Sequence, residues 1–272
     1  MNKNLKLIII IIIIWSIGPL LWQLYTSFST TENLINPFNI TSNRWTLENY
    51  TNLFKSDPTF IRFIINSFIV GITTSLFTII ISIPSAYAIN KFSNLYQRTF
   101  KSILFLTTLF PHILLFLTFL ELARMLDLGN NLFTLAIPYT GLSLPLSILL
   151  LNSSFKDIPP ELEEAANLEG LNLLERLFYI ILPIAKPSIA STTILVFLFT
   201  WNEYPIALSW ITKSNLLTLP VSIARIAGSS MYTVPYGAYA AATVLGSIPL
   251  ILLVLLFQKQ IISGLTNGAI KR

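Results

Sequence analysis

The sequence contains no cysteine and a single histidine, His112. The absence of cysteine excludes disulfide bonds, thiolate metal sites and cysteine nucleophiles. One histidine does not favour a metal site built from imidazole ligands. Charged residues are also scarce, at 11% of the 272 residues, whereas a soluble domain carries about 25%. The composition therefore favours a membrane environment.

A phosphate-binding loop is missing as well. The pattern Gly-x-x-x-x-Gly-Lys-Ser/Thr occurs nowhere in the sequence. If ATP drives this protein, the nucleotide must therefore be bound by another subunit. The net charge of +5 is modest and does not indicate nucleic-acid binding.

Long apolar runs are what the sequence has in abundance. Hydrophobic residues make up 54% of the chain, and the mean hydropathy is +0.71. A helix needs about 20 apolar residues to cross a bilayer. We expect an all-α polytopic membrane protein in which one domain, residues 1–272, contains six transmembrane helices. Their expected positions are about 5–28, 62–89, 100–122, 132–152, 184–211 and 236–257.

The first apolar run has a competing interpretation as a cleaved signal peptide. Lys3 and Lys6 precede an isoleucine-rich run, as in such peptides. However, Trp15 follows the run, no small-x-small cleavage site is present there, and the apolar character continues through Trp22. We expect an uncleaved first span.

The distribution of Lys and Arg predicts the orientation of the chain. The termini and the second and fourth loops carry 11 of these 17 residues. The opposite side carries the other 6, which are Arg44, Lys55, Arg62, Arg124, Lys213 and Arg225. Cytoplasmic loops are enriched in Lys and Arg. Both termini and the loop 153–183 are therefore expected in the cytoplasm.

The loop 153–183 begins with a predicted short helix in a polar, acidic segment. Pro160 suits the first helical position, and acidic residues follow near the positive end of the helix dipole. Gly170 can adopt the positive φ that ends such a helix. Ala165 and Ala166 give a patch of small residues that allows another surface to come close. A compact helix of this kind on the aqueous side is typical of a docking element.

A second short helix is predicted in the remainder of the loop. Asn172 is followed three residues later by Glu175, which predicts a capping box at the start of this helix. Pro183 is expected to mark the exit of the chain from it, because proline interrupts the helical hydrogen bonds.

The spacing of the loop resembles the EAA loop of permease subunits in ATP-binding-cassette (ABC) importers. Glu164-Ala165-Ala166 is followed after three residues by Gly170, and after nine more by Ile180-x-Leu182-Pro183. A bare E-A-A-x-x-x-G is a weak signal, since these are common helix residues. With the Ile-x-Leu-Pro tail, between two spans, the pattern is specific. The alternative is an ordinary amphipathic helical hairpin.

The resemblance extends over nearly the whole chain. Four other stretches resemble the carbohydrate (maltose-transporter-type) branch of the binding-protein-dependent transport family, namely residues 63–67, 84–88, 201–204 and 264–271. Each is only moderately specific by itself. Their order and spacing carry the resemblance.

This resemblance implies the permease subunit of an ATP-driven importer for a sugar, oligosaccharide or polyol in a bacterial or archaeal cytoplasmic (inner) membrane. The implied partners are the lipid bilayer, a second permease subunit, two ABC ATPase subunits and an extracytoplasmic solute-binding protein. The chain would be no enzyme and hold no cofactor or metal, with ATP and Mg bound by the ATPase subunits. The residues implied in ATPase coupling are Glu163, Glu164, Ala165, Ala166, Gly170, Leu182 and Pro183.

Polar residues within the spans are candidates for a substrate pathway, because they are costly in lipid and usually face a cavity or another helix. Asn202 and Glu203 lie in the expected fifth span beside Trp201 and Tyr204. Sugars are bound by hydrogen-bonding side chains together with aromatic faces. The alternative is that this cluster bonds a neighbouring helix or belongs to a gate. His112 either reaches the pathway or pairs with a backbone carbonyl.

Other functions remain as alternatives. A secondary transporter would need its own coupling site and an internal repeat, and few ionisable residues and no visible repeat argue against it. A structural or assembly factor would explain the spans but not the pattern from Glu164 to Pro183. Glycerol phosphate is the alternative substrate of a permease. No Lys or Arg is expected at the middle of a span to pair with its phosphate.

Overall fold

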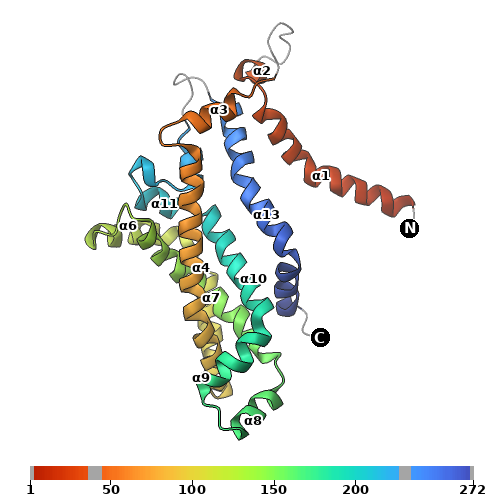
Figure 1. Cartoon of the computed structure of the whole chain (residues 1–272), viewed down its shortest axis with the longest axis vertical. Coiled ribbons are helices and arrows are strands. Elements are labelled where there is room, and N and C mark those ends of the chain that lie inside the picture. The colour runs from red at the N-terminus through yellow and green to blue at the C-terminus, as the bar shows by residue number, and fades with distance from the viewer. Residues whose placement is uncertain (1–2, 36–44, 227–233, 270–272) are drawn as a thin grey trace. The chain divides into compact units, whose positions relative to one another are not determined.

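The computed structural model describes residues 3–35, 45–226 and 234–269. Within these residues the secondary structure is helical, apart from one isolated bridge between Ser29 and Trp45 (Figure 1). The all-α class is thus confirmed. Arg44, Lys271 and Arg272, which entered the orientation argument, lie outside the described residues, as does the end of the 264–271 stretch.

Within the described ranges, four helices are long and apolar enough to cross a membrane. They are α4 (Phe60–Lys91), α7 (Leu132–Lys156), the continuous helix Leu173–Asn202, and Tyr236–Gln260 within α13 (Tyr236–Ala269). A fifth arises if α5 (Asn94–Thr108) and the following segment His112–Met125 form one bent span. The helix α1 (Lys3–Ser27) contains the shorter apolar stretch Ile11–Ser27.

The third expected span, 100–122, is not one straight helix. The helix α5 ends at Thr108, and the 3-10 turn η1 (His112–Leu115) then leads into α6 (Phe116–Met125) at an angle of 81°. Pro111 lies at the break. Because proline has no N–H and its ring crowds the preceding turn, a helix cannot continue regularly through it.

The fifth expected span, 184–211, is interrupted near its end. The helix α10 (Leu182–Asn202) stops before Glu203, whose backbone is extended with ψ 129°. A new short helix, α11 (Pro205–Trp210), follows. Pro205 cannot donate the hydrogen bond that would prolong α10, so the chain changes direction there.

The chain forms two compact units, which are described separately. The first contains residues 1–64 and 218–252, and the second contains residues 65–217 and 253–272. In the first unit, short helices accompany α1 and the start of α13. These are α2 (Thr31–Ile35), α3 (Glu48–Lys55) and α12 (Leu219–Ala224).

A tight contact in the first unit requires glycine at position 237. The side-chain amide of Asn49 donates to the carbonyl oxygens of Ser27 at 2.9 Å and Ser29 at 3.0 Å. A Cβ at Gly237 would lie only 2.5 Å from the Asn49 Nδ2 atom and 2.8 Å from the Ser29 oxygen. Any side chain there would therefore displace this hydrogen-bonded corner.

The second unit is held by an aromatic cluster where α4 meets α10. Trp201 stacks on Phe197 with ring centroids 5.5 Å apart, and Phe68 lies edge-on to Trp201 at 4.9 Å. A Cβ at Gly71 would lie 2.7 Å from the ring of Phe197. The absence of a side chain at Gly71 therefore allows the two helices to approach closely.

The outer part of α4 is fixed to a distant turn of the same unit. The 3-10 turn η3 (Ser214–Leu216) follows α11. The side-chain amide of Asn66 donates to the carbonyl oxygens of Asn215 at 3.1 Å and Leu217 at 2.9 Å. A buried polar side chain within α4 thus satisfies its hydrogen bonds on the backbone of this turn.

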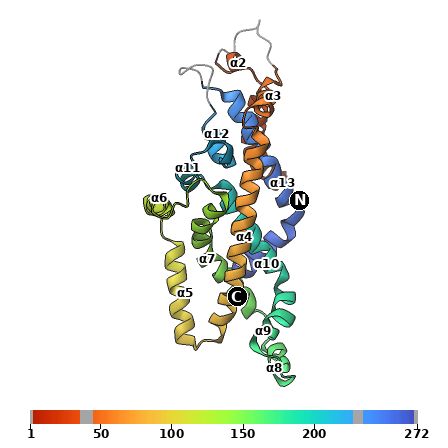
Figure 2. The same ribbon diagram turned by 60° about the vertical axis from the view of Figure 1, so that its left-hand side comes forward.

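The polar loop lies at one end of the second unit. Figures 1 and 2 show α8 (Pro160–Leu168) and α9 (Leu173–Arg176) beyond the ends of α4 and α7, far from α6 and α11. The turn η2 (Leu177–Ile181) joins α9 to α10.

Candidate functional site

The helix α8 begins and ends at the residues expected from the sequence. Pro160 is in the first turn, where a missing N–H costs no hydrogen bond. Gly170 has φ +85°. The amide of Leu171 donates to the Ala166 oxygen at 3.0 Å and that of Gly170 to the Asn167 oxygen at 3.1 Å, which is a Schellman motif. The prediction that Gly170 closes this helix is confirmed.

The predicted capping box is also confirmed. The Asn172 Oδ1 atom accepts hydrogen bonds from the amides of Leu174 and Glu175, both at 3.0 Å. In return, the Asn172 amide donates to the Glu175 carboxylate at 2.7 Å. These bonds satisfy backbone donors that the first turn of α9 would otherwise leave unpaired.

The prediction that Pro183 marks an exit from the second helix is wrong. The chain forms one helix from Leu173 to Asn202, and Pro183 lies in the first turn of α10. The preceding η2 is a π-helical turn, in which the Leu182 amide donates to the Leu177 oxygen five residues earlier. A widened turn of this kind lets the helix continue past a proline that a regular α-helical turn would not accept.

The π-turn is anchored in a hydrophobic cluster. Leu177 and Ile181 are 2% and 1% exposed and pack with residues of α4, α7 and α10, namely Ala86, Tyr87, Ile89, Ile148, Leu151, Phe155 and Ala185. Leu182 packs against the edge of this cluster, whereas Pro183 is exposed. The loop is therefore tied to the helix bundle through Leu177, Ile181 and Leu182.

Polar contacts hold the same helix ends together. The buried side-chain amide of Asn152 donates to the Ala86 oxygen and to the Asn90 Oδ1 atom, both at 2.9 Å. The hydroxyls of Ser154 and Ser188 are 2.6 Å apart. The ends of α4, α7 and α10 are thereby joined by hydrogen bonds as well as by apolar packing.

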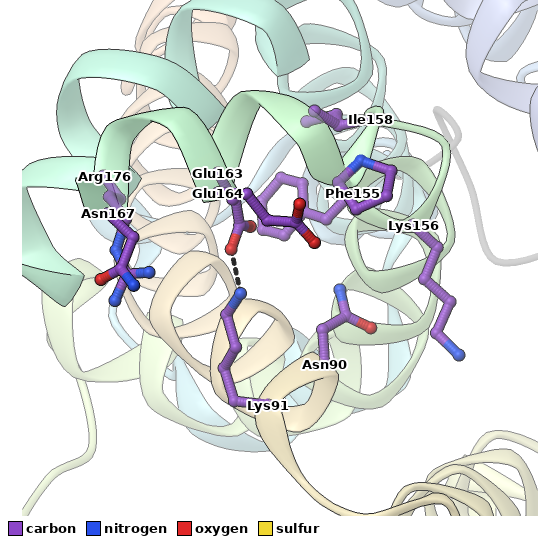
Figure 3. A pocket seen from close by; sticks show the side chains of 10 residues that line it. Asn90, Lys91, Phe155, Lys156, Ile158, Glu163, Glu164, Asn167 and Arg176 are labelled. Atoms are coloured by element: carbon purple, nitrogen blue, oxygen red, sulfur yellow. Dashed lines mark hydrogen bonds and ion pairs between the residues drawn. The ribbon is translucent and has the colours of Figure 1, made fainter. Parts of the chain in front are cut away.

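A cavity of about 430 Å³ lies between α8 and the ends of α4 and α7 (Figure 3). Glu163 of α8 points at Lys91, the last residue of α4, and forms an ion pair with it. Amide, basic, acidic and apolar side chains share the lining, which consists of Asn90, Lys91, Phe155, Lys156, Ile158, Pro160, Glu163, Glu164, Asn167 and Arg176.

The four residues 163–166 do not share one face of α8. The side chain of Glu163 is 20% exposed and Ala166 is 4% exposed, whereas Glu164 and Ala165 are exposed. Successive helical residues are rotated by about 100°, so neighbours in sequence cannot all face outward. Of the two alanines, only Ala165 belongs to the exposed face, whereas Ala166 is buried.

The motif 201–204 is dispersed by the structure. Trp201 is buried in the aromatic cluster. Asn202 is exposed, and its side-chain amide donates to the Leu198 oxygen at 2.7 Å. Tyr204 is half-buried at the bend before α11. These residues therefore do not face one common space.

Glu203 holds the bend between α10 and α11. Its carboxylate accepts hydrogen bonds from the amides of Ile206 at 2.9 Å and Ala207 at 3.1 Å, and from the hydroxyl of Tyr139 in α7. It thus caps α11 and links it to α7. These contacts match the alternative interpretation, in which Glu203 bonds a neighbouring helix.

His112 and Glu203 line one cavity of about 200 Å³. The imidazole lies edge-on to the ring of Phe199, with centroids 5.9 Å apart. Among the described residues, the His112 side chain forms no hydrogen bond with a backbone carbonyl. A smaller cavity of about 90 Å³ is also lined by His112, together with Ser143 and Thr192. Polar side chains of α5, η1, α7 and α10, together with Glu203, therefore line these two cavities.

Three residues of these sites were not found from the sequence. Lys91 entered only the orientation argument, although its place at the end of an apolar run is typical of a helix terminus facing water. Tyr139 and Asn152 lie within an apolar run, and a polar group there was a signal of a buried contact. Their partners are 62 or more residues away, so spacing alone could not identify them. Among the described residues, no group of three or more metal-binding side chains is found.

The sequence matches known transport proteins over most of its length. A family described as "Binding-protein-dependent transport system inner membrane component" matches residues 78–267. The chain is 34% identical to the sulfoquinovosyl glycerol transport system permease protein SmoH of Agrobacterium fabrum, over 96% of this chain and 91% of that protein. It is 35% identical to the trehalose/maltose transport system permease protein MalG of Thermococcus litoralis, over 99% and 97%.

The fold is also similar to that of a solved transporter. A chain from the crystal structure of a bacterial ABC transporter involved in the import of the acidic polysaccharide alginate has a TM-score of 0.67. The match covers 94% of both chains at 18% sequence identity. A second structure, in complex with alginate pentasaccharide-bound periplasmic protein, gives a TM-score of 0.66. At this level of identity the similarity concerns the fold.

Proposed function

Because the chain belongs to the family of binding-protein-dependent transport system inner membrane components, we propose that it is the permease subunit that carries a sugar, oligosaccharide or polyol through the membrane in an ATP-driven importer. It is a translocation subunit and not an enzyme. Relatives named for trehalose, trehalose/maltose and sulfoquinovosyl glycerol transport support a carbohydrate substrate. One observation carries the proposal. The segment from Pro160 to Pro183 forms the short helix α8 and then leads into the long apolar helix Leu173–Asn202.

The subunit works with partners that supply energy and solute. These are a second permease subunit, two ABC ATPase subunits that bind ATP and Mg, and an extracytoplasmic solute-binding protein. The sequence supports a separate source of ATP hydrolysis, because it has no phosphate-binding loop. A similar fold found together with a solute-bound periplasmic protein supports the last partner.

The chain crosses the membrane six times, with both termini in the cytoplasm. The four long apolar helices and the bent pair support five crossings, and α1 provides the sixth. The excess of Lys and Arg on the side of the termini supports the orientation. The loop 153–183 then lies in the cytoplasm, where ATPase subunits bind.

Within that loop, α8 is the helix that docks on an ATPase subunit. Its exposed residues Glu164 and Ala165 form the contact surface, and Gly170 lets α8 end sharply so that it moves as a rigid body. Leu182 anchors the return into the membrane through the hydrophobic cluster. Glu163 and Ala166 lie on the face of α8 that is turned toward the rest of the chain, and they hold α8 in place.

The substrate pathway passes the two cavities lined by His112. His112 and Glu203 supply polar groups, and Phe199 supplies an aromatic face, which is the combination that suits a sugar. Asn202, which is exposed and precedes Glu203 in the chain, is a further candidate for this pathway. Trp201 and Tyr204 support the bend rather than contact solute.

Transport by the reconstituted complex tests the proposed function. The complex is purified from native membranes through a tagged permease and placed in liposomes with its solute-binding protein. We expect uptake of a labelled disaccharide that requires ATP on the cytoplasmic side and persists when ionophores abolish ion gradients. Uptake that follows an ion gradient without ATP would instead show a secondary transporter. Competition by glycerol phosphate, but not by trehalose or maltose, would assign the alternative substrate.

A further inference from the structure

Adjacent glutamates of α8 have different surroundings. Glu163 turns toward the chain itself and pairs with Lys91 (Figure 3), whereas Glu164 lines the same cavity but is exposed. Lys91 and Glu163 thus form an ion pair between side chains of two different helices. The pair joins α8 to a helix 72 residues away in sequence.

Lys91 is itself held in place by α4. Its ammonium lies 4.8 Å from the centroid of the Tyr87 ring, one turn earlier in the same helix, which is a cation–π contact. Tyr87 is 3% exposed and belongs to the hydrophobic cluster that also contains Leu177 and Ile181. The positive charge that meets Glu163 is therefore held against a residue of the buried hydrophobic cluster.

The helix α8 has few other connections to the bundle, so a contact with α4 can affect its position. Three residues, 157–159, join α8 to α7, and four residues, 169–172, join it to α9. Apolar contact with the bundle is limited, since Ala166 is the one buried residue of α8. The Lys91–Glu163 pair adds a direct link from α8 to α4, which is one of the apolar helices long enough to span the membrane.

We propose that Lys91 is a positioning residue, which with Glu163 ties the docking helix α8 to the end of α4 so that both move together. Glu163 then serves the chain's own helices, and Glu164 serves the partner surface. Because this role requires α8 to be the docking helix, it rests on the proposed function. The simpler alternative is a surface ion pair with little effect, which partly exposed pairs often are. The side chain of Lys91 is 36% exposed, and charge reversal distinguishes the two roles.

Reversal of the two charges tests this role. The variants Lys91→Glu, Glu163→Lys and the double exchange are each reconstituted in the full transporter, and solute uptake is measured per ATP hydrolysed. We expect each single exchange to lower this ratio about fivefold or more, the factor that corresponds to losing one well-placed interaction. The double exchange should restore at least half of the wild-type ratio. Lys91→Arg, which keeps the charge, should stay close to wild type.

A matched control uses the other lysine of the cavity. Lys156 lines the same cavity but is not paired with Glu163. Lys156→Glu combined with Glu163→Lys should therefore restore nothing. Restoration by Lys156→Glu as well would show a general charge effect and overturn the specific pair.

The outcomes separate this proposal from the proposed function. A wild-type complex that lacks ATPase subunits or imports no solute would refute the proposed function, whatever Lys91 does. Normal wild-type import, with single exchanges that have no effect or a double exchange that restores nothing, would overturn the role of Lys91. If the exchanged chains do not reach the membrane, Lys91→Gln is used, and an unchanged ratio of uptake to hydrolysis in that variant likewise overturns it.

Discussion

The loop 153–183 and the bend at Glu203 both lead the chain from one helix into the next, but different contacts hold them. In the loop, the ends of α8 and α9 are set by neighbours in sequence, namely Gly170, Asn172 and Glu175. At the bend, the carboxylate of Glu203 also binds Tyr139, which lies 64 residues earlier. The ends of locally capped helices are set within the loop itself. A bend bonded to another helix depends on its surroundings.

This difference fits two mechanical roles. A docking helix must hold its own shape while it passes movement on to the helix that it is tied to, and local caps support that shape. A bend beside a cavity must hold the side chains that line the cavity in fixed positions, and a hydrogen bond to a neighbouring helix fixes the bend. The comparison can be tested by removing each kind of contact in turn, and the expected effects decrease in the order below.

The largest effect is expected from Glu203→Ala. It would leave the amides of Ile206 and Ala207 and the hydroxyl of Tyr139 without their acceptor, at a cost of about 1–3 kcal/mol for each group that stays buried. We expect a marked fall in the thermal unfolding midpoint of the purified subunit in detergent. Glu203→Gln, which keeps an acceptor oxygen, should lose much less. Equal midpoints for Glu203→Ala and wild type would show that the bend does not depend on this contact.

Gly170→Val should affect coupling more than overall stability. A β-branched residue at φ +85° is strained by roughly 1–2 kcal/mol. If α8 transmits the movement, solute uptake should fall about tenfold, since about 1.4 kcal/mol changes an equilibrium by that factor. Gly170→Asn is the control, because asparagine tolerates the left-handed conformation. The measurement is uptake at matched membrane levels, and wild-type uptake by Gly170→Val would reduce α8 to an ordinary cytoplasmic helix.

Asn172→Ala removes the capping box and should cost about 1 kcal/mol. The effect should remain within the loop, because the box joins residues of the same helix. Hydrogen exchange measured by mass spectrometry should show faster exchange of the amides in residues 171–176 and unchanged exchange in α11. Faster exchange that also reached α11 would contradict the separation between the two regions.

The smallest effect on stability is expected from Asn202→Ala. Asn202 is exposed and bonds only the Leu198 carbonyl of its own helix among the described contacts, so the unfolding midpoint should change little. If Asn202 borders the substrate pathway, the solute concentration for half-maximal uptake should still rise. Unchanged uptake kinetics would place Asn202 outside the pathway.

The sequence was most informative where the determinants of structure are local. The positive φ of Gly170 and the capping box at Asn172 follow from residue types at short spacing, and both were predicted. Hydropathy did not locate the breaks in the third and fifth expected spans, because the apolar composition continues through Pro111 and Pro205 although the regular helical backbone does not. Hydropathy measures the preference for lipid, whereas the break is decided by a missing N–H.

The roles of single side chains were harder to predict because they depend on tertiary contacts. Ala165 and Ala166 are identical in type, yet one is exposed and the other is buried against the bundle. The partner of Glu163 lies in another helix, and no local pattern marks Lys91 as that partner. The sequence could therefore identify the coupling segment but not divide its residues between inward and outward contacts.

The π-turn at Leu177–Ile181 has a consequence for the direction in which α8 presents its exposed face. A π-turn contains one residue more than the α-helical turn that it replaces. Deletion of Tyr179, which is exposed, would remove this extra residue. The helix α9, and with it the end of the linker to α8, would then rotate by about 100° and shift by about 1.5 Å relative to α10. The one extra residue in the π-turn thus helps to set the direction in which the exposed face of α8 points.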